Sequence, residues 1–310
     1  MTTIIINPLA GSRGRHDPGP QRAALAKQLL DAHQLEGRVF VSQYPGHASV
    51  LAREAVAGGS SLVCAWGGDG TLNEVASVLA HTSVPLGVIP AGSGNGFARE
   101  LGISADPEVA LAQALTGRDR VIDAGEIAGR LFFNVAGIGL DAHIAALFNT
   151  RAPHRRGFWR YVLLGWRELT RYRPASYLLD ADGERLDVEA IMVVLANLRQ
   201  YGNGAYIAPL AQPDDGHLDL VVVQSMSLMR TFLLTARLFA GNLHRARGIL
   251  TRRVTRISIA SSTRLLCHVD GETFEAGTAV TATVRPQALR VRVPGTVVSQ
   301  QSSVGSERRS

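Results

Sequence analysis

The sequence predicts a Rossmann-like α/β domain with a parallel sheet, followed by an antiparallel β-sandwich domain. The length of 310 residues suits about two domains. β-branched runs alternate with helix-like segments at first, and strand-like runs separated by turn dipeptides dominate later. We expect the first domain over residues 1–123 and the second over 124–293, with the segment from about 294 to 310 able to pack back on the first.

Strands and helices alternate regularly through the first domain. Segments of this length form βαβ units, with helices on both faces of a parallel sheet. Ligands of such sheets bind at the carboxyl ends of the strands. The expected strands are Ile4–Ile6, Arg38–Ser42, Ser61–Trp66 and Leu86–Ile89, and the expected helices are Ala23–Ala32, Ala48–Ala57, Thr71–Leu79 and Asp106–Leu115.

The second domain is expected to be mainly β. Asp-Gly dipeptides at 182–183, 215–216 and 270–271 mark turns between its strands, and two helices are expected over Phe158–Tyr172 and Leu228–Leu238. The expected strands are Leu131–Val135, Ser176–Ala181, Ala190–Ala196, Leu218–Gln224, Val254–Ala260, Leu265–Val269, Ala279–Val284 and Leu289–Val293.

Composition narrows the function classes. A net charge of +6 and a pI near 9.9 favour anionic partners, namely nucleic acid, anionic lipid or phosphorylated substrates. Lys27 is the only lysine and lies in a helix-like stretch, so a Walker A loop and the protein-kinase strand lysine are both excluded. Cys64 and Cys267 lie in apolar runs and are expected to be buried thiols. We predict a cytoplasmic protein, because neither a signal peptide nor a membrane-spanning segment is evident.

A glycine-rich segment follows the third predicted strand and opens the next helix. It runs from Trp66 to Glu74 as Trp-Gly-Gly-Asp-Gly-Thr-Leu-Asn-Glu. Glycines here let backbone N–H groups approach a phosphate, and a helix N-terminus favours negative charge. Asp69 would repel phosphates unless it held Mg²⁺ or polarised a nucleophile beside them. Thr71 could cap the helix in a capping box with Glu74; the alternative is that the segment is only a capped tight turn.

A second flexible loop follows the next predicted strand. It runs from Pro90 to Arg99 as Pro-Ala-Gly-Ser-Gly-Asn-Gly-Phe-Ala-Arg. It offers a hydroxyl, an amide and a guanidinium. The guanidinium, on Arg99, could bind a phosphate in bidentate fashion. Taken alone, this loop could equally be a connector with an exposed arginine. Two such loops at neighbouring strand ends would converge on one crevice.

These two loops belong to an ordered set of motifs. They are followed by Val121-Ile122-Asp123, by Asn134-Val135-Ala136-Gly137-Ile138-Gly139 and by Asp270-Gly271-Glu272. With this set the chain resembles the diacylglycerol kinase catalytic-domain family, which includes bacterial lipid kinases and the sphingosine and ceramide kinases. The resemblance runs from about Ile4 to Val293. It implies a fold like those of NAD kinase and diacylglycerol kinase, with ATP and Mg²⁺ between the domains and a lipid hydroxyl as acceptor.

The resemblance also implies roles for individual residues. Asp69, Asp123 and Asp270 would form an acidic, metal-linked catalytic centre near Arg99. Either Asp270 or Glu272 would be the general base on the lipid hydroxyl; on physical grounds alone an Asp-Gly pair in a β domain is more often a hairpin turn. The expected nucleotide-binding residues are Asn7, Arg13 in the loop 11–13, Ser42, Gly67, Gly68, Asp69, Gly70, Thr71, Gly92, Ser93, Asn95 and Glu272.

The loop from Gln212 to Asp219 resembles the structural Mg²⁺ site of the family. The pattern places the ligand carboxylate on Asp215 and backbone carbonyl ligands on Gln212 and His217, which are hard oxygen donors of the kind Mg²⁺ prefers. The alternative is a solvated turn. The chain also departs from the family, because Gly96 stands where aspartate is common and arginines replace the usual lysines.

A membrane contact is expected near Arg151–Arg173, which holds seven arginines, two tryptophans and one acidic residue. A second basic stretch covers Arg237–Arg256, and for either segment a core-facing helix with a solvated basic face is the alternative. We expect a lipid substrate at the membrane surface and no nucleic-acid partner, since no nucleic-acid-binding signature is present. Relatives make a homodimer conceivable.

The leading hypothesis is therefore an ATP-dependent kinase of diacylglycerol or a related glycerolipid, acting in phospholipid metabolism. NAD kinase is an alternative, since it shares the Gly-Gly-Asp-Gly turn and the two-domain plan, although the second loop and the basic aromatic segment argue against it. A nucleotide-sensing protein without transferase activity is another alternative. The four acidic residues Asp69, Asp123, Asp270 and Glu272 argue against that reading.

Overall fold

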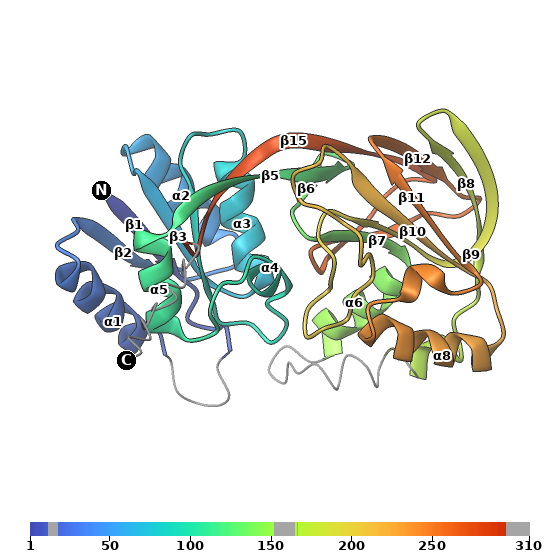
Figure 1. The fold of residues 1–310 in the computed structure, drawn as a ribbon, viewed down its shortest axis with the longest axis horizontal. Coiled ribbons are helices and arrows are strands. Elements are labelled where there is room, and N and C mark those ends of the chain that lie inside the picture. The colour runs from blue at the N-terminus through green and yellow to red at the C-terminus, as the bar shows by residue number, and fades with distance from the viewer. Residues whose placement is uncertain (12–17, 152–164, 166, 296–310) are drawn as a thin grey trace, which may run out of the picture.

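The computed structural model describes residues 1–11, 18–151, 165 and 167–295 of the chain. Two parts lie side by side along the long axis of the molecule, an α/β domain that holds the N-terminus and a mainly β domain (Figure 1). This arrangement confirms the fold class predicted from the sequence. Residues 296–310 and Arg13 lie outside the described residues, so the expected packing of the chain end falls there too.

The α/β domain is built on a parallel sheet with the strand order β4-β3-β1-β2. Its strands are buried along almost their whole length, except for β2 at the edge, as expected of a sheet covered on both faces. The strands are β1 (Thr2–Ile6), β2 (Gly37–Val41), β3 (Leu62–Gly67) and β4 (Leu86–Pro90).

Helices cover both faces of this sheet. α1 and α5 pack together on one face, and α2 and α3 pack together on the other. α5 begins after Asp106, whose carboxylate accepts hydrogen bonds from the amides of Glu108 and Val109 and so caps the helix. The helices are α1 (Gly19–Ala32), α2 (His47–Ala57), α3 (Asp69–Leu79), α4 (Gly96–Glu100) and α5 (Pro107–Thr116).

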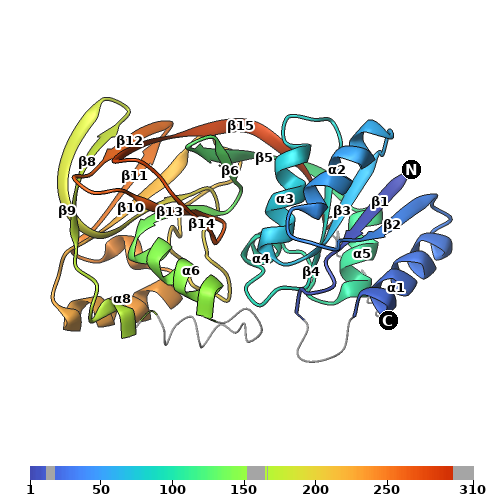
Figure 2. The ribbon, with the colours of Figure 1, turned by 180° about the vertical axis from the view of Figure 1, so that it is seen from behind.

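Two long strands join the domains. β5 (Arg118–Ile127) and β15 (Ala279–Val293) pair with each other in antiparallel fashion across the boundary (Figures 1 and 2). β15 also pairs with β12 in the second domain and with β4 in the first. The two sheets are therefore hydrogen-bonded into one continuous path, which fixes the domains relative to each other at this seam.

The second domain consists of antiparallel strands. β9 is the longest strand that lies wholly within this domain. Its first half pairs with β8, and its second half pairs with both β7 and β10. The remaining pairs are β12 with β8, β13 with β7 and β14, β10 with β11, and β5 with β6. The strands are β6 (Arg130–Phe132), β7 (Val135–Gly139), β8 (Ala175–Ala181), β9 (Glu184–Ala196), β10 (Leu218–Gln224), β11 (Ile249–Val254), β12 (Arg256–Ala260), β13 (Leu266–Val269) and β14 (Glu272–Glu275).

Helices lie along one edge of this β domain. α6 (Leu140–Arg151) and α8 (Leu228–Phe239) are seen at the lower edge in Figures 1 and 2, with the short 3₁₀ helix η1 (Leu243–Arg245) after α8. The predicted helix over Phe158–Tyr172 falls largely on undescribed residues. Among the described residues, no helix is long and apolar enough to cross a membrane.

Three hydrophobic clusters fill the molecule. One lies around the parallel sheet, one lies between the layers of the β sandwich, and one lies between the sandwich and its two helices. Phe133 and Leu198, from the second domain, belong to the cluster around the parallel sheet. The first core therefore continues across the domain boundary.

Two strand predictions differ from the structure in an instructive way. The expected strand Leu131–Val135 is interrupted, because the chain leaves β6 after Phe132 and enters β7 only at Val135. The expected strands Ala279–Val284 and Leu289–Val293 are one strand, β15, with an irregular register between Arg285 and Leu289. Both irregular points present backbone N–H groups to buried carboxylates, as described below.

Candidate active site

The carboxyl ends of the four parallel strands gather most of the predicted nucleotide-binding residues. Asn7 follows β1, and Ser42 follows β2 with its amide donating to the Ile6 carbonyl at 2.8 Å. The two glycine-rich loops follow β3 and β4, and they touch: a Cβ on Gly68 would lie 3.3 Å from the Gly92 Cα. The structure therefore brings these loops onto one edge of the sheet, as the sequence predicts for a parallel α/β domain.

Asp69 is the first residue of α3, at the point where the first glycine-rich loop becomes a helix. The predicted cap by Thr71 and Glu74 is wrong: α3 begins two residues before Thr71, after Gly68, without a side-chain cap. The Thr71 hydroxyl instead accepts a hydrogen bond from the side-chain Nδ2 of Asn7 at 2.8 Å. This early start matters, because the first-turn amides of a helix lack intrahelical acceptors and point at whatever lies beyond its end.

Asn95 closes the second loop and directs it toward Asp69. Its backbone is left-handed, with φ of 49°, and its side chain bonds both the amide and the carbonyl of Gly92. Its own amide donates to Asp69 Oδ2 at 3.0 Å. The Asn95 side chain is thus used to shape the loop, and the two loops are coupled through the Asp69 carboxylate.

The other predicted residues of the second loop are more exposed. Ser93 accepts a hydrogen bond from Asn203 on its carbonyl, and Arg99 is exposed with its Nε donating to the Gly94 carbonyl at 3.2 Å. Gly96 is buried, and a Cβ there would lie 2.5 Å from the Tyr201 carbonyl oxygen. The departure from the family pattern at this position therefore has a physical reason, since the backbone of Tyr201 fills the space an aspartate would need.

Asp270 forms the centre of the second half of the site. It lies in the two-residue turn between β13 and β14 with φ of 48°, followed by Gly271 at 91°, a hairpin turn of the type expected for Asp-Gly. Its carboxylate accepts four hydrogen bonds of 2.8 to 3.0 Å, from the Asn73 side chain and from three consecutive backbone amides. The amides are those of residues 133–135, where the predicted strand is interrupted.

The bond from Asn73 crosses the domain boundary. Asn73 lies on α3 of the first domain, while Asp270 belongs to the second. Farther along the boundary, Glu100 on α4 pairs with Arg199 and accepts a bond from Gln200. Side-chain contacts from α3 and from α4 therefore hold the two domains together beside the site.

Glu272, two residues after Asp270, reaches the same place. A Cβ on Gly70 would lie 3.1 Å from Glu272 Oε1, so this carboxylate sits against the first turn of α3. Glu272 is exposed, in contrast to Asp270. The structure thus brings Asp69, Asp270 and Glu272 together.

The pKa values of Asp69 and Asp270 are both shifted by their surroundings. Burial, and next the negative charge of Asp270, raise the pKa of Asp69 to about 6, while backbone amides including that of Asn95 oppose the rise. Burial also raises the pKa of Asp270, against its four hydrogen bonds. A buried carboxylate whose ionised form is further destabilised by a neighbouring carboxylate is typical of a site completed by a cation or a proton.

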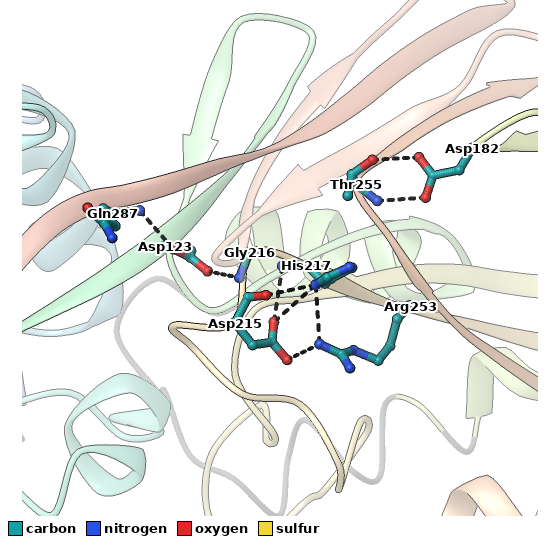
Figure 3. Close-up of polar contacts among 8 residues, drawn as sticks. All are labelled: Asp123, Asp182, Asp215, Gly216, His217, Arg253, Thr255 and Gln287. Carbon is teal, nitrogen blue, oxygen red and sulfur yellow. Dashed lines mark hydrogen bonds and ion pairs between the residues drawn. The ribbon is translucent and has the colours of Figure 1, made fainter.

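Asp123 contacts the loop 213–216. Its carboxylate accepts 2.7 Å hydrogen bonds from the backbone amides of Gly216 and Gln287 (Figure 3). Its own backbone amide donates to the Pro213 carbonyl. Gln287 belongs to the irregular part of β15. Asp123 therefore ties both domain-crossing strands to the loop that was expected to bind Mg²⁺.

That loop carries Asp215, whose carboxylate already has partners. Oδ1 accepts the His217 amide at 3.0 Å, and Oδ2 forms an ion pair with Arg253 (Figure 3). Both oxygens of this carboxylate therefore already accept N–H donors, and the positive charge of the Arg253 guanidinium would oppose a metal ion beside it, so the arrangement disfavours the expected Mg²⁺ site. Within the described residues, no three His, Cys, Asp or Glu side chains form a group that could hold a metal. Burial, and then Asp215, raise the pKa of the neighbouring Asp219 to about 6.

A buried polar cluster that the sequence analysis missed supports the Asp270 turn. His268 Nδ1 accepts the Gly271 amide at 3.3 Å, and Nε2 lies 2.8 Å from the Asp141 carboxylate, which also accepts the Tyr201 hydroxyl. Burial lowers the pKa of His268, but the carboxylates of Asp141 and Asp270 together outweigh it and the net shift is upward. A Cβ on Gly137 would lie 2.1 Å from Asp141, so only glycine fits there.

Asn197 links Asp123 to the Asp270 region. Its side-chain Nδ2 donates to the carbonyls of Asp123 and Phe133 at 2.9 and 3.0 Å, and the Phe133 backbone amide in turn donates to the Asp270 carboxylate. A single polar residue inside an apolar strand run was the available signal for Asn197 and for His268. Their partners, distant in the sequence, could not be inferred.

The comparisons with known proteins fit this geometry. Residues 1–127 match the diacylglycerol kinase catalytic domain, and residues 134–293 match the C-terminal NAD kinase β-sandwich-like domain named after YegS. A protein of Pseudomonas aeruginosa named "Probable lipid kinase YegS-like" is 33% identical over 276 residues, which are 88% of this chain and 89% of that protein. The chain belongs to the diacylglycerol kinase catalytic-domain family.

Other members agree with this assignment and confirm the resemblance stated from the motifs. A diacylglycerol kinase of Mycobacterium tuberculosis is 34% identical over 249 residues, covering 77% of this chain and 78% of its own. The crystal structure of a diacylglycerol kinase from Bacillus anthracis shares the fold, with a TM-score of 0.71 over 96% of this chain and 98% of that one, at 20% identity.

The raised pKa of Asp69 predicts that its ionised carboxylate lowers the free energy of unfolding at neutral and higher pH. A carboxyl whose pKa is raised on folding stabilises the fold at low pH, and this stabilisation is lost as the pH rises through the folded pKa near 6. Asp69→Asn should therefore raise the free energy of unfolding at pH 8 by about 1–3 kcal/mol, and less at pH 5. Thermal unfolding in EDTA without nucleotide measures this.

The control is Asp31→Asn, which removes an exposed carboxylate from α1. A wild-type protein more stable than Asp69→Asn at pH 8 would contradict the assignment of a strained carboxylate.

Proposed function

We propose that this family member is an ATP- and Mg²⁺-dependent lipid kinase that phosphorylates the hydroxyl of diacylglycerol or a related glycerolipid. One observation carries the proposal: the Asp270–Glu272 turn of the second domain meets the first turn of α3, where Asp69 lies. Phosphoryl transfer needs phosphate-binding amides, an acidic group for the metal and a base for the acceptor in one place. The names of the relatives support a lipid as that acceptor.

The nucleotide would bind along the carboxyl edge of the parallel sheet. The first-turn amides of α3 would receive its phosphates, and the Asn7–Thr71 bond would hold that turn in position. Ser42 and the Gly92–Asn95 loop would border the same edge, and the exposed Arg99 could move to the transferred group. Arginine fits such a group in a bidentate manner.

Mg²⁺ bound with the nucleotide would neutralise charge that builds up on the phosphates during transfer. Asp69 is the residue suited to hold it, because the nearby Asp270 destabilises its ionised form and a cation would relieve this repulsion. The donor chemistry of Asp69 suits Mg²⁺, because it is a carboxylate at the N-terminal end of a helix whose first-turn amides face the phosphates.

Glu272 is better suited than Asp270 to be the general base. A carboxylate offers about four lone-pair positions, and Asp270 already accepts four N–H donors. Glu272 is exposed and lies against Gly70, so it can accept a proton from a lipid hydroxyl. In this proposal Asp270 is a positioning residue, which fixes the turn that carries Glu272.

Membrane contact is proposed through α8. Its buried residues Thr231 and Leu234 face the sandwich, while Leu228, Met229 and Leu233 are 54%, 70% and 57% exposed. The same helix carries the exposed Arg230 and Arg237 and no acidic residue. Apolar side chains flanked by arginines suit the surface of an anionic bilayer. Most of the segment Arg151–Arg173 lies outside the described residues and stays a prediction.

The first test of the function is phosphate transfer from labelled ATP, with Mg²⁺, to a panel of lipid alcohols in mixed micelles, with NAD as a soluble acceptor. We expect label on a glycerolipid from wild type and a loss of at least about a thousandfold with Asp69→Ala. Label on NAD would instead identify a NAD kinase. ATP binding without label on any acceptor would favour a nucleotide-sensing protein.

Substitutions of Glu272 and Asp270 should differ in their effect on the stability of the protein. Glu272→Gln should lower kcat by about 10²–10⁴-fold and leave the melting temperature unchanged, as expected for loss of a general base. Asp270→Asn turns an amide group toward backbone N–H donors and should lower the free energy of unfolding by about 2–4 kcal/mol. Equal destabilisation by both variants, measured by chemical denaturation, would reject this division of roles.

Membrane binding should depend on the exposed side chains of α8. Met229→Ser combined with Leu233→Ser should weaken co-sedimentation with vesicles containing anionic phospholipid by about tenfold or more, because two apolar side chains no longer enter the bilayer. Leu178→Ser on β8, which is 61% exposed, is the matched control and should bind like wild type. If control and test variants bind alike, α8 is not the docking helix.

A further inference from the structure

Arg253 lies close to two carboxylates, those of Asp215 and Asp219. In the antiparallel pair of β10 and β11, Arg253 is directly opposite Asp219, so the strand register itself sets the arginine beside this acidic group. Its guanidinium also reaches Asp215 in the preceding loop, with which it forms an ion pair. Nη2 lies 3.2 Å from His217 Nδ1 as well (Figure 3).

The loop around Asp215 is otherwise shaped by its own backbone. The Asp215 carboxylate accepts the His217 amide, and its carbonyl lies 2.8 Å from the His217 ring nitrogen. The Gly216 backbone amide donates to the Asp123 carboxylate, and the Pro213 carbonyl accepts a bond from the Asp123 backbone amide. The loop thus has backbone anchors toward Asp123, and Arg253 is the positive charge in direct contact with Asp215 from the strand side.

We propose that the Arg253 guanidinium takes the place of a structural divalent cation at the loop 212–219, so that the fold of this chain does not depend on Mg²⁺ there. The resemblance to the family implied Mg²⁺ on Asp215, but both oxygens of Asp215 face N–H donors in this structure. A guanidinium is always charged and can bridge two carboxylates through several N–H groups.

The consequence reaches beyond the loop. From Asp215 the contacts continue through Gly216 to Asp123, from Asp123 to Asn197, and from there through Phe133 to Asp270. Asp123 lies on β5 and binds Gln287 of β15, the two strands that cross between the domains. Arg253 therefore lies at one end of a chain of contacts that connects β5 and β15, the strands that cross between the domains, with the turn that carries Glu272. This inference concerns folding and stands whether or not the proposed activity is correct.

The test is thermal unfolding of the full chain without nucleotide, first stripped with EDTA and then titrated with Mg²⁺ to several millimolar. The wild-type melting temperature should change by less than about 1 °C. Arg253→Gln leaves Asp215 without its cation and should melt about 2–4 °C lower, and Mg²⁺ should restore part of this loss. Adding Asp215→Asn to Arg253→Gln should abolish the restoration, because the proposed ligand is gone.

Arg252→Gln is the matched control. Arg252 is the neighbour on the same strand and pairs with the exposed Glu184, so its removal should change the melting temperature little and create no Mg²⁺ response. A saturable rise of the wild-type melting temperature with Mg²⁺ that disappears in Asp215→Asn would overturn the proposal. So would Arg253→Gln behaving like Arg252→Gln. If Arg253→Gln does not fold even with Mg²⁺, the wild-type titration still decides.

Discussion

The structure of the site depends on how the Asp270 carboxylate is held. Four N–H donors converge on it, three from the consecutive amides of residues 133–135 and one from Asn73 on the other domain. A buried carboxylate is costly unless hydrogen bonds satisfy it. Any shift of α3, of the 133–135 segment or of the β13–β14 hairpin would leave donors and acceptor unpaired. One side chain therefore fixes three elements, and with them the distance between Asp69 and Glu272.

The same constraint explains where local sequence patterns mislead. Leu131 to Val135 is an apolar run, and period and composition favour an unbroken strand. A regular strand would point successive amides in opposite directions, whereas Asp270 needs three amides that converge. The interruption between β6 and β7 resolves this conflict in favour of the long-range partner. The irregular part of β15 is similar, because it delivers the Gln287 amide to Asp123.

Much of the molecule could nevertheless be predicted. Alternation of strands and helices is a local property, so the parallel domain and most element positions followed from period, glycines and turn pairs. The meeting of the glycine-rich loops followed from topology, since parallel strands end at one edge. What sequence could not supply were partners brought together by strand register or by the second core. Arg253 was one arginine among many until the pairing of β10 with β11 set it opposite Asp219. His268 and Asn197 likewise needed their buried partners to acquire a role.

Two different solutions to buried negative charge are thus built into one chain. Asp270 and Asp123 are satisfied by backbone amides, and Asp215 is satisfied by an arginine, so these carboxylates are complete within the protein. Asp69 is not complete in the same sense: burial and Asp270 raise its pKa to about 6, and so its ionised form is destabilised near neutral pH. Asp69 lies at the start of a helix beside two glycine-rich loops, and the repulsion between its carboxylate and that of Asp270 would be relieved by a proton or by a positively charged ligand. That asymmetry is the physical argument for a cation arriving with the nucleotide at Asp69, and for its absence from the arginine-bound loop.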